Sequence, residues 1–271
     1  MTEIDTRLNK ARSEVNLAEN TLGRALYALD QAIKARAEEQ PCPTPDTASS
    51  PLPPLDIRGM RLWKWSDWHA SEWDNGFSNI PWRAARVHWQ SDDTVLLDLT
   101  DAGAPELQAP DSALRAAGLW QIDVTLPEKR EGMCVAPLWL YAKSDGRKGE
   151  IDFEFTREGL QVTIHSHHTG GAKSYGVTLP NTKEWGGKRF LLGIRADING
   201  GIIEMLVDGK VAHTFRRADH PEAFPTEPLK TFISMWTAKA GLGWTEGWLG
   251  KWGGMTATER LAMVVHGYSV S

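Results

Sequence analysis

The chain begins with a helical pattern of apolar residues. From Ile4 to Ala32, apolar side chains recur at alternating spacings of four and three, which is the a/d pattern of a coiled coil. Most other positions in residues 1–40 are charged or polar, and none is proline. The pattern predicts an amphipathic helix that either joins copies of the chain into a homo-oligomer or packs on the chain's own main domain.

A sharp change of composition follows this helix. Six of the 15 prolines lie within residues 41–54, among threonine, serine and aspartate. Proline has no amide hydrogen and excludes the helix, so an extended and semi-rigid spacer is predicted here. We therefore expect an N-terminal helix over residues 1–40, a proline-rich linker over 41–57 and one main domain over 58–271.

The main domain has the alternating pattern of β-strands. Short apolar runs with a period of two are bounded by turn residues at 94–99, 119–126, 160–165 and 202–207. Asn199-Gly200 and Asp208-Gly209 bracket the last run, and both dipeptides favour tight hairpin turns. Many short strands with turns between them predict an all-β antiparallel sandwich. The glycines of residues 241–252 predict a loop there that displays several tryptophans.

Residues 149–155 carry the most distinctive alternation of the chain. Glu150, Asp152 and Glu154 alternate with three apolar residues, so in a strand the acidic side chains share one face. Acidic residues are depleted in strands and repel one another when they are neighbours. The structural alternative is a solvent-facing acidic strand. The functional alternative is a retaining glycosidase. Such an enzyme cleaves a glycosidic bond with retention of configuration and needs two carboxyl groups about 5–5.5 Å apart.

Simple lengths allow this chemistry. Positions i and i+4 of a strand lie about 13 Å apart, and two glutamate side chains that lean toward each other close most of that distance. Glu150 and Glu154 would then be separated as in a retaining enzyme, and Asp152 between them would hydrogen-bond one of them.

Residues 150–154 resemble the signature of glycoside hydrolase family 16, E-[IL]-D-x-E, which they match without a gap. The chain resembles in particular the bacterial endo-β-1,3-1,4-glucanases, the lichenases. Further similar segments follow in the same order at 73–76, 81–84, 118–120, 207–210, 233–236 and 248–250. The resemblance implies a jelly roll of the concanavalin A-like kind, with a concave sugar-binding face. It also implies that Glu150 is the nucleophile, Asp152 its helper and Glu154 the general acid/base.

The same resemblance suggests residues that bind the sugar. An aromatic ring can lie against the apolar face of a pyranose, and several lichenase tryptophans and tyrosines line the cleft. In an ungapped comparison, a serine and a histidine after the catalytic strand also face the cleft. The candidates are Asn75, Trp139, Tyr141, Ser166, His168, Trp236 and Trp248.

Some positions depart from the lichenase pattern and predict a retuned cleft. Lys148 stands in place of a tryptophan, Gln108 in place of a glutamate that touches sugar, and Ser234 in place of an asparagine. His266 falls where an aspartate helps to hold a structural calcium, so we expect no metal site. Ile80 occupies one position of the disulfide found in some members, and two unpaired thiols are expected instead. No cofactor is implied.

The composition of the chain argues against two kinds of partner, nucleic acid and a membrane. A net charge of −5 and a pI near 5.9 argue against nucleic acid, and no apolar run approaches the ~18–20 residues of a membrane span. Residues 1–20 are rich in charge and lack the apolar core of a secretory signal. This predicts a location in the cytoplasm or export by a route other than general secretion.

These observations predict a retaining endo-glycosidase that cleaves a β-linked polysaccharide, either a β-glucan or a bacterial exopolysaccharide. A transglycosylase would use the same site, with a sugar in place of water. A non-catalytic carbohydrate-binding module is the alternative from another class, and a structural component of a particle is a third. The three acidic residues favour the enzyme, since binding alone does not require them.

Overall fold

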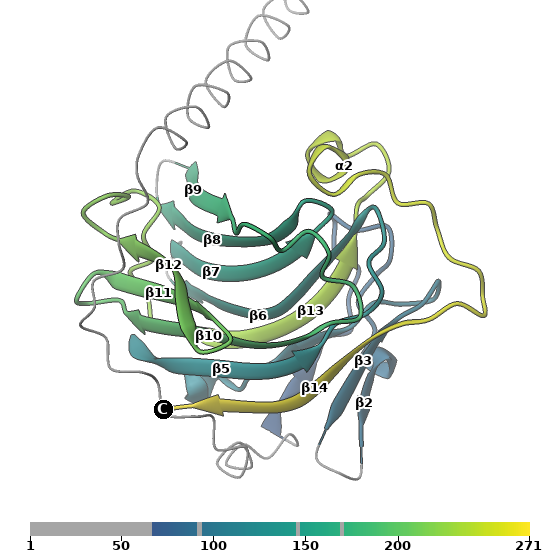
Figure 1. The fold of residues 1–271 in the computed structure, drawn as a ribbon, viewed down its shortest axis with the longest axis horizontal. Coiled ribbons are helices and arrows are strands. Elements are labelled where there is room, and N and C mark those ends of the chain that lie inside the picture. The colour runs from purple at the N-terminus through teal and green to yellow at the C-terminus, as the bar shows by residue number, and fades with distance from the viewer. Residues whose placement is uncertain (1–66, 91–93, 145–146, 169–170) are drawn as a thin grey trace, which may run out of the picture. The chain divides into compact units, whose positions relative to one another are not determined.

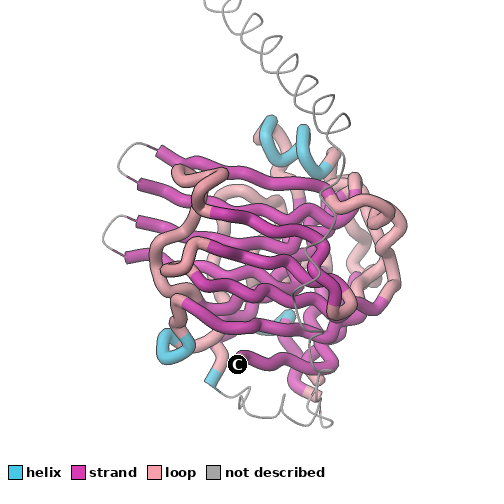
Figure 2. The backbone as a smooth tube through the Cα atoms, turned by 60° about the vertical axis from the view of Figure 1, so that its left-hand side comes forward, coloured by secondary structure: helices cyan, strands magenta, loops and turns pink. Residues whose placement is uncertain are grey.

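Two antiparallel sheets of seven strands each make up the part of the chain that the computed structural model describes, residues 67–90, 94–144, 147–168 and 171–271 (Figure 1). The expected helix 1–40, its coiled-coil association and the linker 41–57 lie outside these residues. Figure 2 shows helical segments only as short pieces at the margins of the strand layers. The predicted all-β antiparallel sandwich is confirmed for the described residues.

The first sheet has the strand order β1-β4-β13-β6-β7-β8-β9. Its strands are β1 (His69–Ala70), β4 (Glu106–Gln108), β13 (Lys230–Thr237), β6 (Met133–Ser144), β7 (Arg147–Thr156), β8 (Gly159–His168) and β9 (Gly171–Thr178). The acidic pattern therefore lies on β7, an inner strand that pairs with β6 on one side and β8 on the other.

The second sheet has the order β12-β11-β10-β5-β14-β3-β2. Its strands are β12 (Lys210–Arg216), β11 (Ile202–Val207), β10 (Arg189–Asp197), β5 (Ala117–Thr125), β14 (Leu261–Val270), β3 (Val95–Leu99) and β2 (Val87–Trp89). The helical segments among the described residues are η3 (Ala84–Arg86), η4 (Asp111–Ala113) and α2 (Gly243–Leu249).

The core lies between the two sheets and takes one face of β7. Ile151, Phe153 and Phe155 are fully buried there, in one cluster with apolar side chains of the second sheet such as Ile122 and Val265. Because successive strand residues point to opposite faces, burial of these three residues turns the acidic side chains of β7 to the outer face of the first sheet.

The hairpin turns follow their sequence signals. Asp208 and Gly209 both have positive φ, 50° and 76°, and join β11 to β12 in a two-residue turn that suits these residues. The turn after β10 contains Gly201, whose amide donates to the carbonyl of Asp197 at 2.9 Å. Both predicted hairpins are confirmed, and they form the edge of the second sheet.

The predicted loop at 241–252 is wrong for Gly243–Leu249, which form the helix α2. Glycine does disfavour this helix, but contacts with the rest of the domain outweigh local propensity. Two residues of the helix, Thr245 and Leu249, are buried. Gly250, with a φ of 85°, follows the last residue and ends the helix. No helix within the described ranges is long and apolar enough to span a membrane.

A buried carboxylate ties two strands of the second sheet to a short helix and to the segment before a third strand. Asp98 on β3 lies within 2.7 Å of His88 Nε2, 2.8 Å of Arg260 Nε and 3.5 Å of Arg86 Nη1. Its side chain is only 3% exposed, so this charge depends on the cationic groups around it. These contacts link β3 to β2, to η3 and to the segment before β14.

We expect Asp98→Asn to lower the free energy of unfolding by about 2–4 kcal/mol, because the amide leaves the cationic groups without their buried counter-charge. The matched control is Asp111→Asn, since Asp111 pairs with Lys230 but is 86% exposed. Exposed pairs of this kind contribute about 0–1 kcal/mol. Urea unfolding of both variants measures the difference, and equal losses would contradict this view of Asp98.

Candidate active site

A cleft of about 480 Å³ opens on the outer face of the first sheet, and the three acidic residues of β7 line it. Aromatic residues form much of its remaining surface: Phe77, Trp82, Trp139, Trp236, Trp244 and Trp248. Its other polar residues are Gln161, Thr163, His165, Ser174 and Ser234. The acidic row thus lies on the floor of a largely aromatic cleft.

The register of the sheet decides which side chains flank each acid. Glu150 lies opposite Tyr141 on β6 and His165 on β8. Two residues further along β7, Asp152 lies opposite Trp139 on β6 and Thr163 on β8. Directly paired residues share a face, so each acid has neighbours on both adjacent strands.

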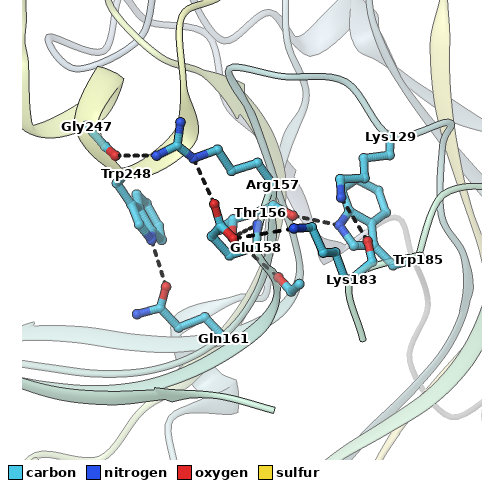
Figure 3. A network of polar contacts seen from close by, with 10 residues as sticks. Lys129, Thr156, Arg157, Glu158, Gln161, Lys183, Trp185, Gly247 and Trp248 are labelled. Carbon is cyan, nitrogen blue, oxygen red and sulfur yellow. Dashed lines mark hydrogen bonds and ion pairs between the residues drawn. The ribbon is translucent and has the colours of Figure 1, made fainter. Parts of the chain in front are cut away.

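Gln161 on β8 flanks the third acid, since it pairs directly with Glu154. Its side-chain oxygen accepts a hydrogen bond from Trp248 Nε1 at 2.7 Å (Figure 3). The residue beside Glu154 is therefore held by α2.

Asp152 is the most deeply buried of the three acids and has an imidazole as its neighbour. Its Oδ2 lies 3.1 Å from His165 Nε2, while His165 Nδ1 lies 2.5 Å from Ser174 Oγ. Asp152 also shares a hydrogen bond with Glu150, which raises the pKa of Glu150 and lowers that of Asp152. That is the sense expected if Glu150 donates its proton to Asp152.

Burial makes the three acids hold protons that exposed carboxyl groups would lose. Burial first, and the charge of Asp152 second, raise the pKa of Glu150 to about 8. Burial also raises the pKa of Asp152 and of Glu154 well above their ordinary values, and the charge of Asp152 adds to the effect on Glu154. Burial therefore favours protonated carboxyl groups in the row, and a protonated carboxyl group is what a general acid requires.

A buried thiol forms a hydrogen bond with Glu154, the third acid of the row. Cys134 on β6 is fully buried and free, and its Sγ donates to Glu154 Oε1 at 3.8 Å. Burial, followed by the charges of Glu154 and Asp152, raises the pKa of this thiol, so it stays protonated and keeps its hydrogen for the carboxylate. The expected unpaired thiol is confirmed at Cys134, whereas Cys42 lies outside the described residues.

Aromatic side chains flank the acidic row on two sides. On one side Trp139 lies 4.5 Å from Phe232 and 6.0 Å from Tyr141, measured between ring centroids. On the other side Trp236 lies 5.7 Å from Trp248. Flat apolar rings on both sides of the carboxyl groups suit a chain of sugars that continues in both directions.

The structure brings most of the expected sugar-binding residues to this cleft. Trp139, Trp236 and Trp248 line it, and Tyr141 packs on Trp139 at its margin. Asn75 is buried in a turn outside the lining, where its Oδ1 accepts from the amide of Ser78 at 2.9 Å. Asn75 therefore shapes the chain beside the cleft instead of facing it.

The expectation that Ser166 faces the cleft is wrong. Ser166 pairs with Gly149 and is fully buried on the core side of β8, whereas its neighbour His165 pairs with Glu150 and lines the cleft. An ungapped comparison places the strand out of phase by one residue, and such a shift moves every side chain to the opposite face of the sheet. The side chain of His168 lies outside the described residues.

Three cleft residues, Gln161, Thr163 and His165, were missed as site candidates. Their spacing of two on the strand after the acids was the available signal, but only the pairing register shows which phase faces the cleft. Thr163 Oγ1 and Trp139 Nε1 are buried without a hydrogen-bond partner among the described residues, so both are available to a bound hydroxyl group.

The positions that depart from the lichenase pattern have their own contacts. Gln108 donates to Ser71 Oγ at 2.8 Å and to Glu106 Oε1 at 3.0 Å. Burial raises the pKa of this Glu106 to about 7, against the lowering effect of the hydrogen bonds that its carboxylate accepts from Ser71 and Gln108. His266 Nε2 lies 2.8 Å from Thr125 Oγ1. No group of three or more His, Cys, Asp or Glu side chains in the described ranges is arranged to hold a metal ion.

The sequence model of glycosyl hydrolases family 16 matches residues 76–255, which is more than half of the chain. The chain belongs to glycosyl hydrolase family 16. It is therefore a glycoside hydrolase, as the acidic row on β7 indicates. No curated protein matches it at a significant level.

Several solved structures share the fold of this chain at low sequence identity. A β-1,3-1,4-glucanase (lichenase) from a mouse hindgut metagenome is 19% identical, with a TM-score of 0.59 over 79% of this chain and 96% of that one. A β-glucanase of Bacillus licheniformis is 18% identical, with a TM-score of 0.60 over 79% and 95%. The κ-carrageenase of Pseudoalteromonas carrageenovora is 11% identical, with a TM-score of 0.58 over 78% and 91%.

Because the pKa of Glu150 is raised in the folded chain, the free energy of unfolding decreases as the pH rises. The unfolded chain releases this proton near the ordinary value of 4.5 and the folded chain near 8, so stability falls with pH between the two. Glutamine mimics the protonated acid, and we expect Glu150→Gln to raise the free energy of unfolding by about 1–3 kcal/mol at pH 8 and by little at pH 4.5.

Urea unfolding at both pH values measures this effect. Glu158→Gln on the following turn is the matched control, since its side chain is 58% exposed and should change stability by less than about 0.5 kcal/mol. A Glu150→Gln effect that is the same at pH 4.5 and pH 8 would show that the carboxyl group is not held protonated by burial.

Proposed function

We propose that this chain is a retaining, endo-acting glycoside hydrolase that cleaves a β-linked polysaccharide through a covalent glycosyl-enzyme. The observation that carries the proposal is the row of three carboxyl groups, on one face of an inner strand and inside an aromatic cleft, with their pKa values raised by burial.

The proposed steps give each of the three acids a role, and Glu154 acts twice, first as an acid and then as a base. The carboxylate of Glu150 attacks the anomeric carbon after passing its proton to Asp152, its hydrogen-bonded neighbour. Glu154 gives its proton to the oxygen of the leaving sugar as the glycosidic bond breaks. In the second half, Glu154 takes a proton from water, whose oxygen attacks the same carbon and releases Glu150.

The neighbours of the row prepare these steps. His165 beside Asp152 stabilises the negative charge that Asp152 shares with Glu150, and the thiol of Cys134 orients Glu154. Aromatic rings on both sides of the row support binding within a long chain instead of at its end. A β-glucan is the first substrate to test, because the similar structures include lichenases and a laminarinase.

A transglycosylase uses the same site, and one observation favours testing it. The rings of Trp236 and Trp248 lie on the Glu154 side of the row and offer a surface for an acceptor sugar after the leaving group departs. Products longer than the starting oligosaccharide, separated by mass, would identify this activity.

We expect the wild-type protein to release reducing ends from barley β-glucan or laminarin and Glu150→Gln to lose that activity by several orders of magnitude. The amide keeps the shape of the side chain but cannot form the glycosyl-enzyme. Glu158→Gln is the control for the same chemical change on an exposed turn, and it should keep full activity. Substantial activity in pure Glu150→Gln protein would rule out this nucleophile.

We expect the product to keep the anomeric configuration of the substrate. Glu150 and Glu154 would lie too close for a water molecule to enter between them, so bond cleavage takes two displacements. Proton NMR in the first minutes of the reaction should show the β-anomer before mutarotation. First release of the α-anomer from a β-linked glucan would overturn the proposed mechanism.

A further inference from the structure

The helix α2 exists because the cleft holds it. It has seven residues and includes Gly243 and Gly247, whereas isolated helices shorter than ~12–15 residues are marginal even without glycine. Figure 3 shows two of its anchors: Trp248 Nε1 donates to Gln161 at 2.7 Å, and Arg157 Nη2 donates to the carbonyl of Gly247 at 3.0 Å. Arg157 directly follows β7, which carries the acidic row, and Gln161 lies on the neighbouring strand β8.

Further contacts fix the start and the buried side of α2. Thr245 Oγ1 donates to the carbonyl of Leu242 at 2.9 Å and accepts from the amide of Lys239 at 3.0 Å. Leu249 is fully buried in a cluster with Cys134 and Trp236. The position of the helix relative to the cleft is therefore set at both of its ends.

Trp244 stands on this anchored helix with its ring largely in solvent. It is 56% exposed, more than any other large apolar side chain in the described ranges, although it lines the cleft. Its ring centroid lies 6.2 Å from that of Trp236, and the two ring planes are tilted by 55°. The ring of Trp244 continues the aromatic lining of the cleft, and exposed apolar surface that is contiguous in this way is typical of a ligand-binding groove.

The order of contacts places Trp244 away from the reacting bond. Cys134 touches Glu154, Trp236 pairs in register with Cys134, and Trp244 lies beyond Trp236 at the rim. Two residues, Trp236 and Cys134, thus connect Trp244 to Glu154, and we assign to Trp244 a sugar further from the carboxyl groups than the sugar beside Trp236.

We propose that Trp244 is a specificity-determining platform that stacks on a sugar remote from the cleaved bond, so that the enzyme selects long glycan chains over short ones. This inference rests on the proposed glycosidase function. Stacking on a remote sugar strengthens binding of substrate and transition state alike, so it acts on KM more than on kcat. A short glycoside that ends before Trp244 gains nothing from it.

The test compares Trp244→Ala and Trp244→Phe on a polymer and on a short substrate. On barley β-glucan or laminarin, whichever the wild type hydrolyses, Trp244→Ala should lower kcat/KM about tenfold through KM, and Trp244→Phe should recover most of it. On a chromogenic aryl β-disaccharide both variants should stay within about twofold of wild type. The control is Trp89→Ala, because Trp89 is 46% exposed but lies on β2 of the other sheet.

Two results would overturn the proposal. An unchanged kcat/KM on the polymer would mean that Trp244 binds no sugar, and an equal loss on both substrates would mean that it shapes the catalytic centre itself. A wild-type protein that releases no reducing ends from either glucan would count against the proposed function. In that case, retardation of Glu150→Gln protein in gels containing each glucan, with and without Trp244→Ala, tests the platform separately.

Discussion

Glu150, Asp152 and Glu154 occupy alternate positions of one inner strand and lose much of their contact with water together. Desolvation and mutual repulsion make this arrangement unfavourable for three charges, so the row keeps protons instead. The arrangement persists because the opposite face of β7 buries Ile151, Phe153 and Phe155 in the core. The apolar half of the strand thus holds the acidic half in place.

The strands on either side then decide what each acid can do. His165 on β8 meets Asp152, and Cys134 on β6 meets Glu154, so the acids have different partners although they share a strand. Different partners separate their proton affinities, which is how chemically similar groups come to act as nucleophile and as acid. The site therefore depends on three adjacent strands and not on the acidic strand alone.

The aromatic surroundings have a cost and a use. Tryptophans that line an open cleft are only partly covered, and α2 must be held by Gln161 and Arg157 to keep Trp248 and Trp244 in the lining of the cleft. Rings held in this way need not be ordered again when a sugar binds, so less entropy is lost at that step.

The amino-acid sequence by itself determined the sandwich, the hairpins at 199–200 and 208–209, and the shared face of the three acids, because these depend on local period and turn chemistry. It did not determine that His165, and not Ser166, pairs with Glu150, because an alternation with a period of two does not fix the register between strands. It also favoured a loop where α2 forms, because the contacts that stabilise this helix come from distant residues. Proton sharing along the row, too, arises only when folding removes the acids from water.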